Sequence, residues 1–366
     1  MKRRTFLLFS LGILMLGAPR ALFAWDGAFY DLLDVPFTAR EAALGGNHAA
    51  QADDVSTLVS NVAGFRSVTP DLQIGAVNMS YYGQPSSPAV TNATFDLFGP
   101  LSIAYVGNGL GFGIFSDATI TTSPTGAYPT VLTQNVLIIT GYAFRIPLAD
   151  PQGTLDVGFS VPIFFAARSF SSKNVGLLLS SAVSPYHFVV DEPFALAAGI
   201  SAEFGVLYSW NKTFSVGLAG RNLAITSASY YNKLGLYQSG ASPYKTDTTP
   251  IPLDISVGVR WNPAVKMSIP SLDGFSLMAD YNDIFDFLIY PADARNPLLH
   301  IGLGAELTLL KIVKLRAGFY QLLPSGGLSL DLSVVALDLA VFGREKSTQP
   351  WTDYVYGFMA GVRIKE

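Results

Sequence analysis

The sequence predicts an all-β protein, a transmembrane antiparallel β-barrel. First, charged residues make up only 14% of the 366 residues, against about 25% in ordinary soluble domains. Second, the mean hydropathy is +0.36, yet no segment of the mature chain offers the roughly 20 uninterrupted apolar residues that a spanning helix needs. Third, several segments alternate apolar and polar residues, as strands do. An apolar chain without spanning helices must place its apolar residues in strands.

The alternation is clearest in the segment from Leu299 to Leu309. One face carries Ile301, Leu303, Ala305, Leu307 and Leu309, and the other carries His300, Gly302, Gly304, Glu306 and Thr308. Residues 195–206, 253–261 and 354–365 repeat this pattern, with bulky apolar side chains on one face and glycines with sparse charges on the other. A barrel with its apolar face toward lipid and its polar face toward the lumen has this pattern. We count roughly 12 to 16 strands.

Turn residues agree with a barrel. Asn108-Gly109 separates two short apolar segments and predicts a type I′ hairpin. Asn211-Lys212 and Leu310-Lys311 mark two further tight connections. Longer loops, rich in Pro, Ser, Thr and Gly, are expected near residues 83–94, 120–130, 226–250 and 343–352. Short turns alternating with long loops are typical of periplasmic turns and extracellular loops.

The N-terminus predicts export. A basic stretch, Lys2 to Arg4, precedes an apolar stretch from Thr5 to Leu16 that is too short to span a membrane. Small residues follow, so residues 1–24 read as a signal peptide that is cleaved after Ala24. Export of a strand-rich apolar chain predicts the bacterial outer membrane.

Composition excludes several functions. The net charge of −4 argues against nucleic acid as a partner, because that binding needs a basic face. The chain contains no cysteine, which removes disulfides, thiolate catalysis, cysteine zinc sites and a lipoprotein anchor. Neither a Gly-x-Ser-x-Gly nor a His-Glu-x-x-His motif is present. We therefore expect no enzymatic activity and no cofactor.

Residues 25–70 form a segment that interrupts the β pattern before the expected barrel at 71–366. Ala39 to Leu44 favours helix, and Gly45-Gly46 stops it. Asp53-Asp54 is placed to cap a following turn. Irregular backbone of this kind cannot face lipid, but a wide barrel can hold it in the lumen. We therefore predict a small helical hatch, or plug.

This segment resembles the N-terminal motif of FadL-like and PorV-like outer-membrane proteins. That motif reads Ala-x-x-Leu-Gly-Gly-Ala, then Ala-Asp-Asp, then Asn-Pro-Ala-Gly-Leu. The matching residues here are Ala43, Leu44, Gly45, Gly46, Ala52, Asp53, Asp54, Asn61, Ala63 and Gly64. The departures are Asn47 for Ala, Val62 for Pro and Phe65 for Leu. Glu306, Leu315 to Gly318 and Asp338 to Ala340 are similar to the closing hairpins of the spirochaete FadL-like branch.

The resemblance implies a barrel of about 14 strands with the hatch in its lumen. It also implies passive uptake of hydrophobic small molecules, with long-chain fatty acids as the ligand class and outer-membrane lipid as the surroundings. Two alternatives remain. PorV-like relatives serve as outer-membrane partners of a protein secretion system, and a plugged barrel can be a structural or adhesive surface protein.

Two groups of residues are candidates for the site. The ligand or hatch group comprises Leu44, Gly45, Gly46, His48, Asp53, Asp54, Asn61, Gly64 and Phe65. The inward charges comprise Glu203, Arg221, Arg260, Asp280, Glu306, Arg316 and Arg363. Such charges either brace the wall and anchor the hatch or bind a ligand carboxylate, whose geometry suits Arg. No metal site is expected, because no Ca²⁺-loop pattern surrounds Asp53-Asp54.

Overall fold

The computed structural model describes residues 38–46, 48–84, 87–95, 102–122, 130–171, 190–251, 254–263, 272–289, 291 and 294–365. The predicted signal peptide and the first part of the predicted hatch, residues 25–37, lie outside these residues. None of the helices within the described ranges has the length and apolar character needed to cross a membrane.

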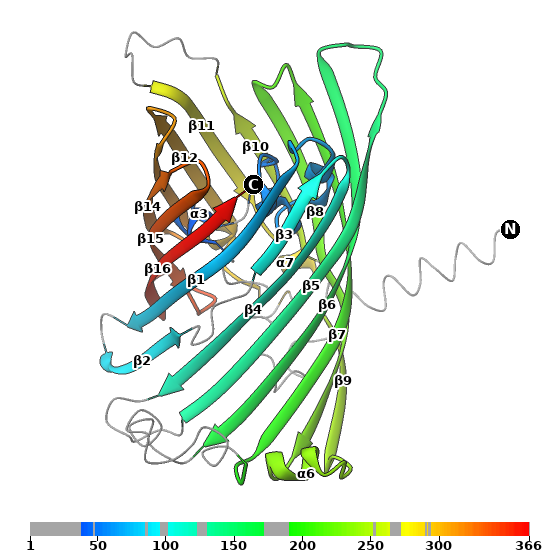
Figure 1. The fold of residues 1–366 in the computed structure, drawn as a ribbon, viewed down its shortest axis with the longest axis vertical. Coiled ribbons are helices and arrows are strands. Elements are labelled where there is room, and N and C mark those ends of the chain that lie inside the picture. Colours follow the sequence, from blue (N-terminus) through cyan, green and yellow to red (C-terminus); the bar gives the residue numbers. More distant parts are fainter. Residues whose placement is uncertain are drawn as a thin grey trace, which may run out of the picture.

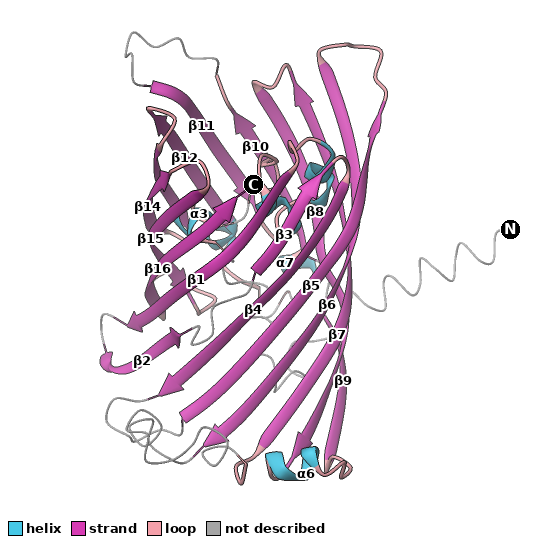
Figure 2. Cartoon of the chain, viewed as in Figure 1, coloured by secondary structure: helices cyan, strands magenta, loops and turns pink. Residues whose placement is uncertain are grey.

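The described chain is mostly antiparallel strand (Figures 1 and 2). The strand segments are β1 (Asp71–Gln84), β2 (Ser87–Phe95), β3 (Ser102–Gly107), β4 (Leu110–Thr122), β5 (Thr130–Ile146), β6 (Gly153–Ser171), β7 (Phe194–Trp210), β8 (Phe214–Tyr231), β9 (Lys245–Ile251), β10 (Asp254–Trp261), β11 (Leu272–Tyr281), β12 (Ile301–Leu309), β13 (Val313–Tyr320), β14 (Leu323–Asp331), β15 (Val335–Glu345) and β16 (Tyr354–Lys365).

These segments close into a barrel. β16 pairs with β1, while β2 and β3 together fill one position between β1 and β4. β9 and β10 likewise both pair with β8. Because two positions are each filled by two segments, the sixteen described segments make 14 wall strands. The prediction of a barrel of about 14 strands is confirmed.

The two predicted faces are confirmed. Leu303 is 44% exposed on the outside of the barrel, whereas Gly302, Gly304 and Glu306 are buried toward the lumen. The outward positions of β10 and β16 also carry exposed apolar side chains, among them Val259 and Phe358. Closed antiparallel barrels with an outward apolar band are of the outer-membrane type. The protein is therefore an outer-membrane β-barrel.

The predicted tight turns at 108–109, 211–212 and 310–311 lie at the same end of the barrel, and a further two-residue turn, Gln321-Leu322, joins β13 to β14 at the other end. Asn108 and Gly109 have φ angles of 55° and 87°, which confirms the predicted type I′ turn. Short turns mark the periplasmic end of such barrels. The opposite end carries the helix α6 (Leu234–Gln238), and the long strands β5 to β8 extend toward it (Figure 1).

Two predicted loops are partly wrong. Most of residues 83–94 belong to β1 and β2, and residues 226–231 continue β8 before β9 resumes pairing with it at Lys245. The polar composition of these segments suggested loops. On the extracellular side, however, a strand can be polar on both faces because water lies on both sides of the sheet.

Within the predicted hatch, the described residues form three short elements that pack against the inner wall: α3 (Ala39–Ala43) and the 3₁₀ turns η2 (Val55–Leu58) and η3 (Val62–Arg66). Thr38 and Glu41 form a capping box at the start of α3. Gly45 has a φ of 83°, and the Gly46 amide donates to the Glu41 carbonyl at 2.9 Å, which closes the helix as a Schellman motif does. The predicted glycine stop is confirmed.

Candidate functional site

Arg40 lies at the centre of the contact between hatch and wall. Its guanidinium donates two hydrogen bonds to Glu306 of β12, at 3.0 and 2.9 Å. It also donates to Asp53 at 2.7 Å and to Asp54 at 2.5 Å. The Arg40 side chain is only 6% exposed. One buried cation therefore joins the first hatch helix, the acidic pair and the barrel wall.

The acidic pair of the hatch is held ionised by these cations. Burial opposes ionisation of Asp53, but Arg40 and Arg260 together hold the pKa of its carboxyl well below the usual value. Arg260 of β10 donates to Asp53 at 2.7 Å. Burial likewise opposes ionisation of Asp54, and Arg40 outweighs it, so the pKa of Asp54 is also lowered. Asp54 caps η2 by accepting from the Ser56 amide at 2.9 Å, as predicted.

The ion pairs continue along the inner wall. Arg316 of β13 donates to Glu306 at 2.6 Å, so the predicted cross-strand pair is confirmed. Arg316 also donates to Ser329, which donates to Asp338 of β15. Arg363 of β16 donates to the same Asp338 carboxylate at 3.0 Å. Five neighbouring strands, β12 to β16, thus share one buried polar network with the hatch.

His48 and Asn61 fix two further points of the hatch. The His48 ring is hydrogen-bonded to the Asp280 carboxylate of β11 and to the Leu44 carbonyl, and Asp280 also accepts from the Ala49 amide at 2.7 Å. The Asn61 amide group donates to the Ala49 carbonyl at 2.6 Å and to the Val206 carbonyl of β7 at 3.2 Å. Both side chains are therefore anchors between hatch and wall.

Wall glycines allow the hatch to lie against the sheet. A Cβ atom added to Gly205 would stand 2.0 Å from the Asn61 side chain, and one added to Gly217 would stand 1.9 Å from the Ala49 carbonyl. A Cβ atom added to Gly158, Gly304 or Gly318 would also stand too close to the hatch, at 2.5, 2.7 and 2.2 Å from its nearest atom. The glycine-rich inner face predicted from the sequence is thus the surface on which the hatch backbone packs.

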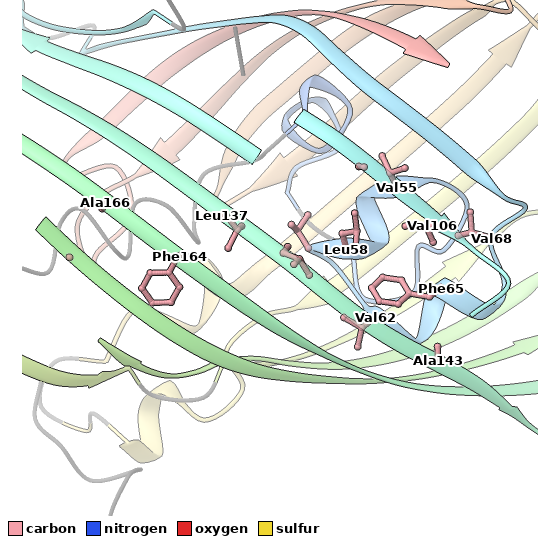
Figure 3. Close-up of a cluster of buried hydrophobic side chains, with 14 of the residues drawn as sticks. Val55, Leu58, Val62, Phe65, Val68, Val106, Leu137, Ala143, Phe164 and Ala166 are labelled. Atoms are coloured by element: carbon pink, nitrogen blue, oxygen red, sulfur yellow. The ribbon is translucent and has the colours of Figure 1, made fainter. Parts of the chain in front are cut away.

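An apolar cluster lines the lumen beside the hatch (Figure 3). Val55, Leu58, Val62 and Phe65 belong to the hatch, and the wall contributes small and large apolar side chains. The wall members are Ala104, Val106, Leu137, Ile139, Ala143, Phe164, Ala166, Ala197 and Ala228. Phe164 is 0% exposed whereas its neighbour Phe165 is 42% exposed, so Phe164 faces the lumen and Phe165 the lipid.

A polar cavity of about 280 Å³ adjoins the ion network. It is lined by Arg40, Asp53, Asp54, Asp71, Gln73, Glu306, Thr308, Lys314, Arg316 and Arg363. Asp71 begins β1, and Thr308 and Lys314 flank the tight β12–β13 turn. The cavity therefore lies toward the periplasmic end, while the apolar cluster continues along the long strands in the opposite direction.

The structure brings most of the predicted residues together but not all of them. Asp53, Asp54, Arg260, Glu306 and Arg316 belong to the Arg40 network. Of the other predicted hatch residues, Leu44 and Phe65 are fully buried and Gly64 packs on Thr57. Of the other inward charges, Arg221 pairs with Asp254 and Glu203 accepts a hydrogen bond from Ser160. Glu203 and Arg221 therefore each bond to a residue other than those of the Arg40 network.

Two features were missed from the sequence. Arg40 is the one basic residue of the short Ala-rich helix α3, and its positive charge was the available signal for the network. Leu137, Ile139 and Phe164 make part of the inner face apolar, although a polar lumen was expected. The uninterrupted apolar stretches at 136–139 and 161–167 were the signal, because a strand that is apolar on both faces is buried on both.

Comparison with known proteins shows the fold. No protein-family model and no curated protein matches the sequence. The toluene transporter TbuX of Ralstonia pickettii is 15% identical, with a TM-score of 0.51 and coverage of 90% of this chain and 98% of that one. The CymD monoaromatic hydrocarbon channel is 12% identical, with a TM-score of 0.51 and coverage of 91% and 97%.

The Pseudomonas putida toluene transporter TodX is 12% identical, with a TM-score of 0.50 and coverage of 91% of this chain and 98% of that one. All three alignments extend over nearly the whole length of both chains. The barrel fold implied by the sequence resemblance is therefore confirmed.

Proposed function

We propose that this barrel takes up hydrophobic small molecules passively across the outer membrane. The observation that carries the proposal is the apolar lining of the lumen beside the hatch, with Leu137, Ile139 and Phe164 pointing inward from β5 and β6. A barrel of this width holds a polar, wet lumen unless it is plugged. An apolar lumen ending on a plug suits an apolar ligand better than a hydrated one.

Long-chain fatty acids are the ligand class we propose. The apolar cluster suits their acyl chain during entry. The arginines of the polar cavity, on the periplasmic side of the hatch, suit their carboxylate during exit, since Arg binds carboxylates with two parallel hydrogen bonds. Arg40, Arg316 and Arg363 line that cavity. The proteins that share the fold are described as toluene transporters and a hydrocarbon channel, which supports a transport role rather than an enzymatic one.

Uptake into proteoliposomes tests both the transport of hydrophobic molecules and the choice of fatty acids as ligand. Purified barrel is reconstituted and offered labelled oleate and, separately, labelled toluene. Saturable oleate uptake that falls about 5- to 150-fold in Phe164→Gln is expected, because a buried polar group in an apolar pocket costs about 1–3 kcal/mol. The control is Phe165→Leu on the lipid face, which should leave uptake unchanged.

The outcomes separate the alternatives. Uptake of toluene without oleate would reject fatty acids as the ligand class and leave hydrophobic transport in place. Uptake of neither molecule by folded barrel would reject transport. Specific capture of exported proteins by the same barrel would then favour a role as partner of a secretion system.

A further inference from the structure

We propose that Asp283, Asp286 and His300 form a binding site for a divalent transition-metal ion of the Zn²⁺ class. One ligand atom from each of these side chains lies within 4.8 Å of the other two. Asp286 is 1% exposed and His300 is 5% exposed. Two carboxylates and one imidazole are donors that zinc accepts. The proposal departs from the expectation of no metal that was drawn from the sequence.

The distance between His300 and Asp286 fits a shared ion. His300 Nε2 lies 3.3 Å from Asp286 Oδ2, which is long for a charge-assisted hydrogen bond, whose usual range is about 2.7–2.9 Å. Two ligand atoms bound at about 2.0–2.1 Å in tetrahedral geometry stand about 3.3 Å apart. The other buried His–Asp pair, His48 with Asp280, is in direct hydrogen-bond contact. The two pairs therefore differ in the separation of the imidazole from the carboxylate.

Neighbouring groups hold the three ligands in place. The Arg295 amide donates to Asp286 Oδ2 at 2.7 Å, and a hydrogen bond to a ligating carboxylate is a common feature of metal sites. The Asp283 amide donates to Asp254 of β10 at 3.0 Å. The Asn282 amide donates to the His300 carbonyl at 2.8 Å, and the Tyr281 ring packs beside the imidazole with centroids 5.6 Å apart.

The ligands come from both ends of one connection. Asp283 follows β11, Asp286 begins α7 (Asp286–Ile289), and His300 ends η4 (Pro297–His300) directly before β12. This connection lies at the extracellular end of the strands, next to the wall residues that bind the hatch: Asp280 precedes it on β11, and Gly304 follows it on β12. An ion at the site would tie the two ends of the connection together beside the hatch.

Zinc is favoured over calcium by the donor set. Ca²⁺ takes six to eight oxygen ligands, and imidazole is foreign to its sites. Imidazole with carboxylates suits zinc and its first-row neighbours. Asp286 and His300 stand 14 positions apart in the sequence, so the site has no short sequence motif by which it could be predicted. The turn that returns the chain from α7 to β12 brings the two side chains together.

Titration calorimetry of chelator-treated barrel in detergent with Zn²⁺ tests the site. We expect one Zn²⁺ per barrel, with affinity lowered more than about tenfold in His300→Gln and in Asp283→Asn. Asp247→Asn is the control, because Asp247 lies on β9 and pairs with Lys245, and it should bind as the wild type does. The midpoint temperature of thermal unfolding should rise on addition of Zn²⁺ in the wild type and in this control, and should stay unchanged in the two ligand variants.

Three results would overturn the proposal. They are no Zn²⁺ bound by the folded wild type, equal binding in His300→Gln, and Ca²⁺ bound in preference to Zn²⁺. His300→Gln and Asp283→Asn are both assayed because Asp283 is only half-buried, so its variant keeps the barrel folded if the histidine variant does not. Oleate uptake by these variants is measured separately, so that failure of the metal site and failure of transport are distinguishable.

Discussion

At the scale of single residues, one arginine decides how the hatch is attached. Arg40 contacts Asp53, Asp54 and Glu306 at the same time and is nearly buried. Removing one partner from a buried ion network leaves the other charges without compensation, which costs far more than a surface pair contributes. The hatch is therefore held by specific charge contacts as well as by apolar packing.

Replacing Arg40 should loosen the hatch and leave the barrel intact. Arg40→Gln removes one cation from three carboxylates, of which Asp53 keeps Arg260 and Glu306 keeps Arg316. We therefore expect a loss of up to about 3–5 kcal/mol in the free energy of hatch docking. Hydrogen exchange of residues 39–58 measures it. Lys245→Gln, on an exposed pair, is the control and should change stability by no more than about 1 kcal/mol. Unchanged protection in Arg40→Gln would show that packing alone holds the hatch.

The attachment at His48 should depend on pH. Burial lowers the pKa of His48, but the Asp280 carboxylate outweighs both burial and the nearby Arg40, so the pKa is raised above its ordinary value of 6.5. Because the folded-state pKa is the higher one, this stabilisation is complete below about pH 6.5 and is lost as pH rises through the folded-state pKa.

The measurement is hydrogen-exchange protection around Ala49, corrected for the intrinsic exchange rate. It is made at several pH values between about 6 and 9, a range that starts just below the ordinary pKa of His. Protection should fall with rising pH in the wild type. His48→Gln, which cannot titrate, should give a flat profile. An equally steep profile in both proteins would assign the pH dependence to another group.

At the scale of elements, hatch and strands are shaped to each other. The hatch presents three alanines of α3 to β15 and β16, where Ala340, Phe342 and Met359 complete a small apolar cluster. Elsewhere the wall offers glycines, so that the hatch backbone approaches the sheet directly. Small residues on both sides bring two backbones close, which is the usual reason for glycine within a strand.

Adding one methyl group to this contact should displace the hatch. Gly205→Ala would place a Cβ 2.0 Å from Asn61 Oδ1, and such overpacking costs about 1–3 kcal/mol. Since a wide barrel without its plug leaves an aqueous channel, conductance in planar bilayers should increase. Gly274→Ala, whose added Cβ meets Thr308 at an ordinary 3.7 Å, is the control. Closed channels in both variants would contradict this packing argument.

At the scale of the whole molecule, the barrel separates two environments. The apolar cluster continues along the long strands from the hatch, and the polar cavity lies on the periplasmic side among the ion pairs. The hatch joins the two because its 3₁₀ turns pack in the apolar cluster and its acidic pair lines the cavity. A ligand that crosses this boundary must move the hatch or pass around it.

Much of the fold could be predicted because a barrel in lipid imposes strict local rules. Outward residues must be apolar and tight turns must adopt particular backbone angles, so the strands around Leu303 and the turn at Asn108-Gly109 were predictable. The hatch was predictable as an irregular segment, and the pairing of Glu306 with Arg316 followed from the turn between them. Each of these depends on residues close in sequence.

The partners of Arg40, His48 and His300 were not predictable. Arg40 and Glu306 are 266 positions apart, and His48 and Asp280 are 232 apart. The sequence by itself determined the two faces of the wall, the place of the hatch and the outer-membrane setting, because lipid and backbone geometry act on every residue locally. Only the closed barrel decided which charges meet, since closure brings the hatch against strands from both halves of the chain.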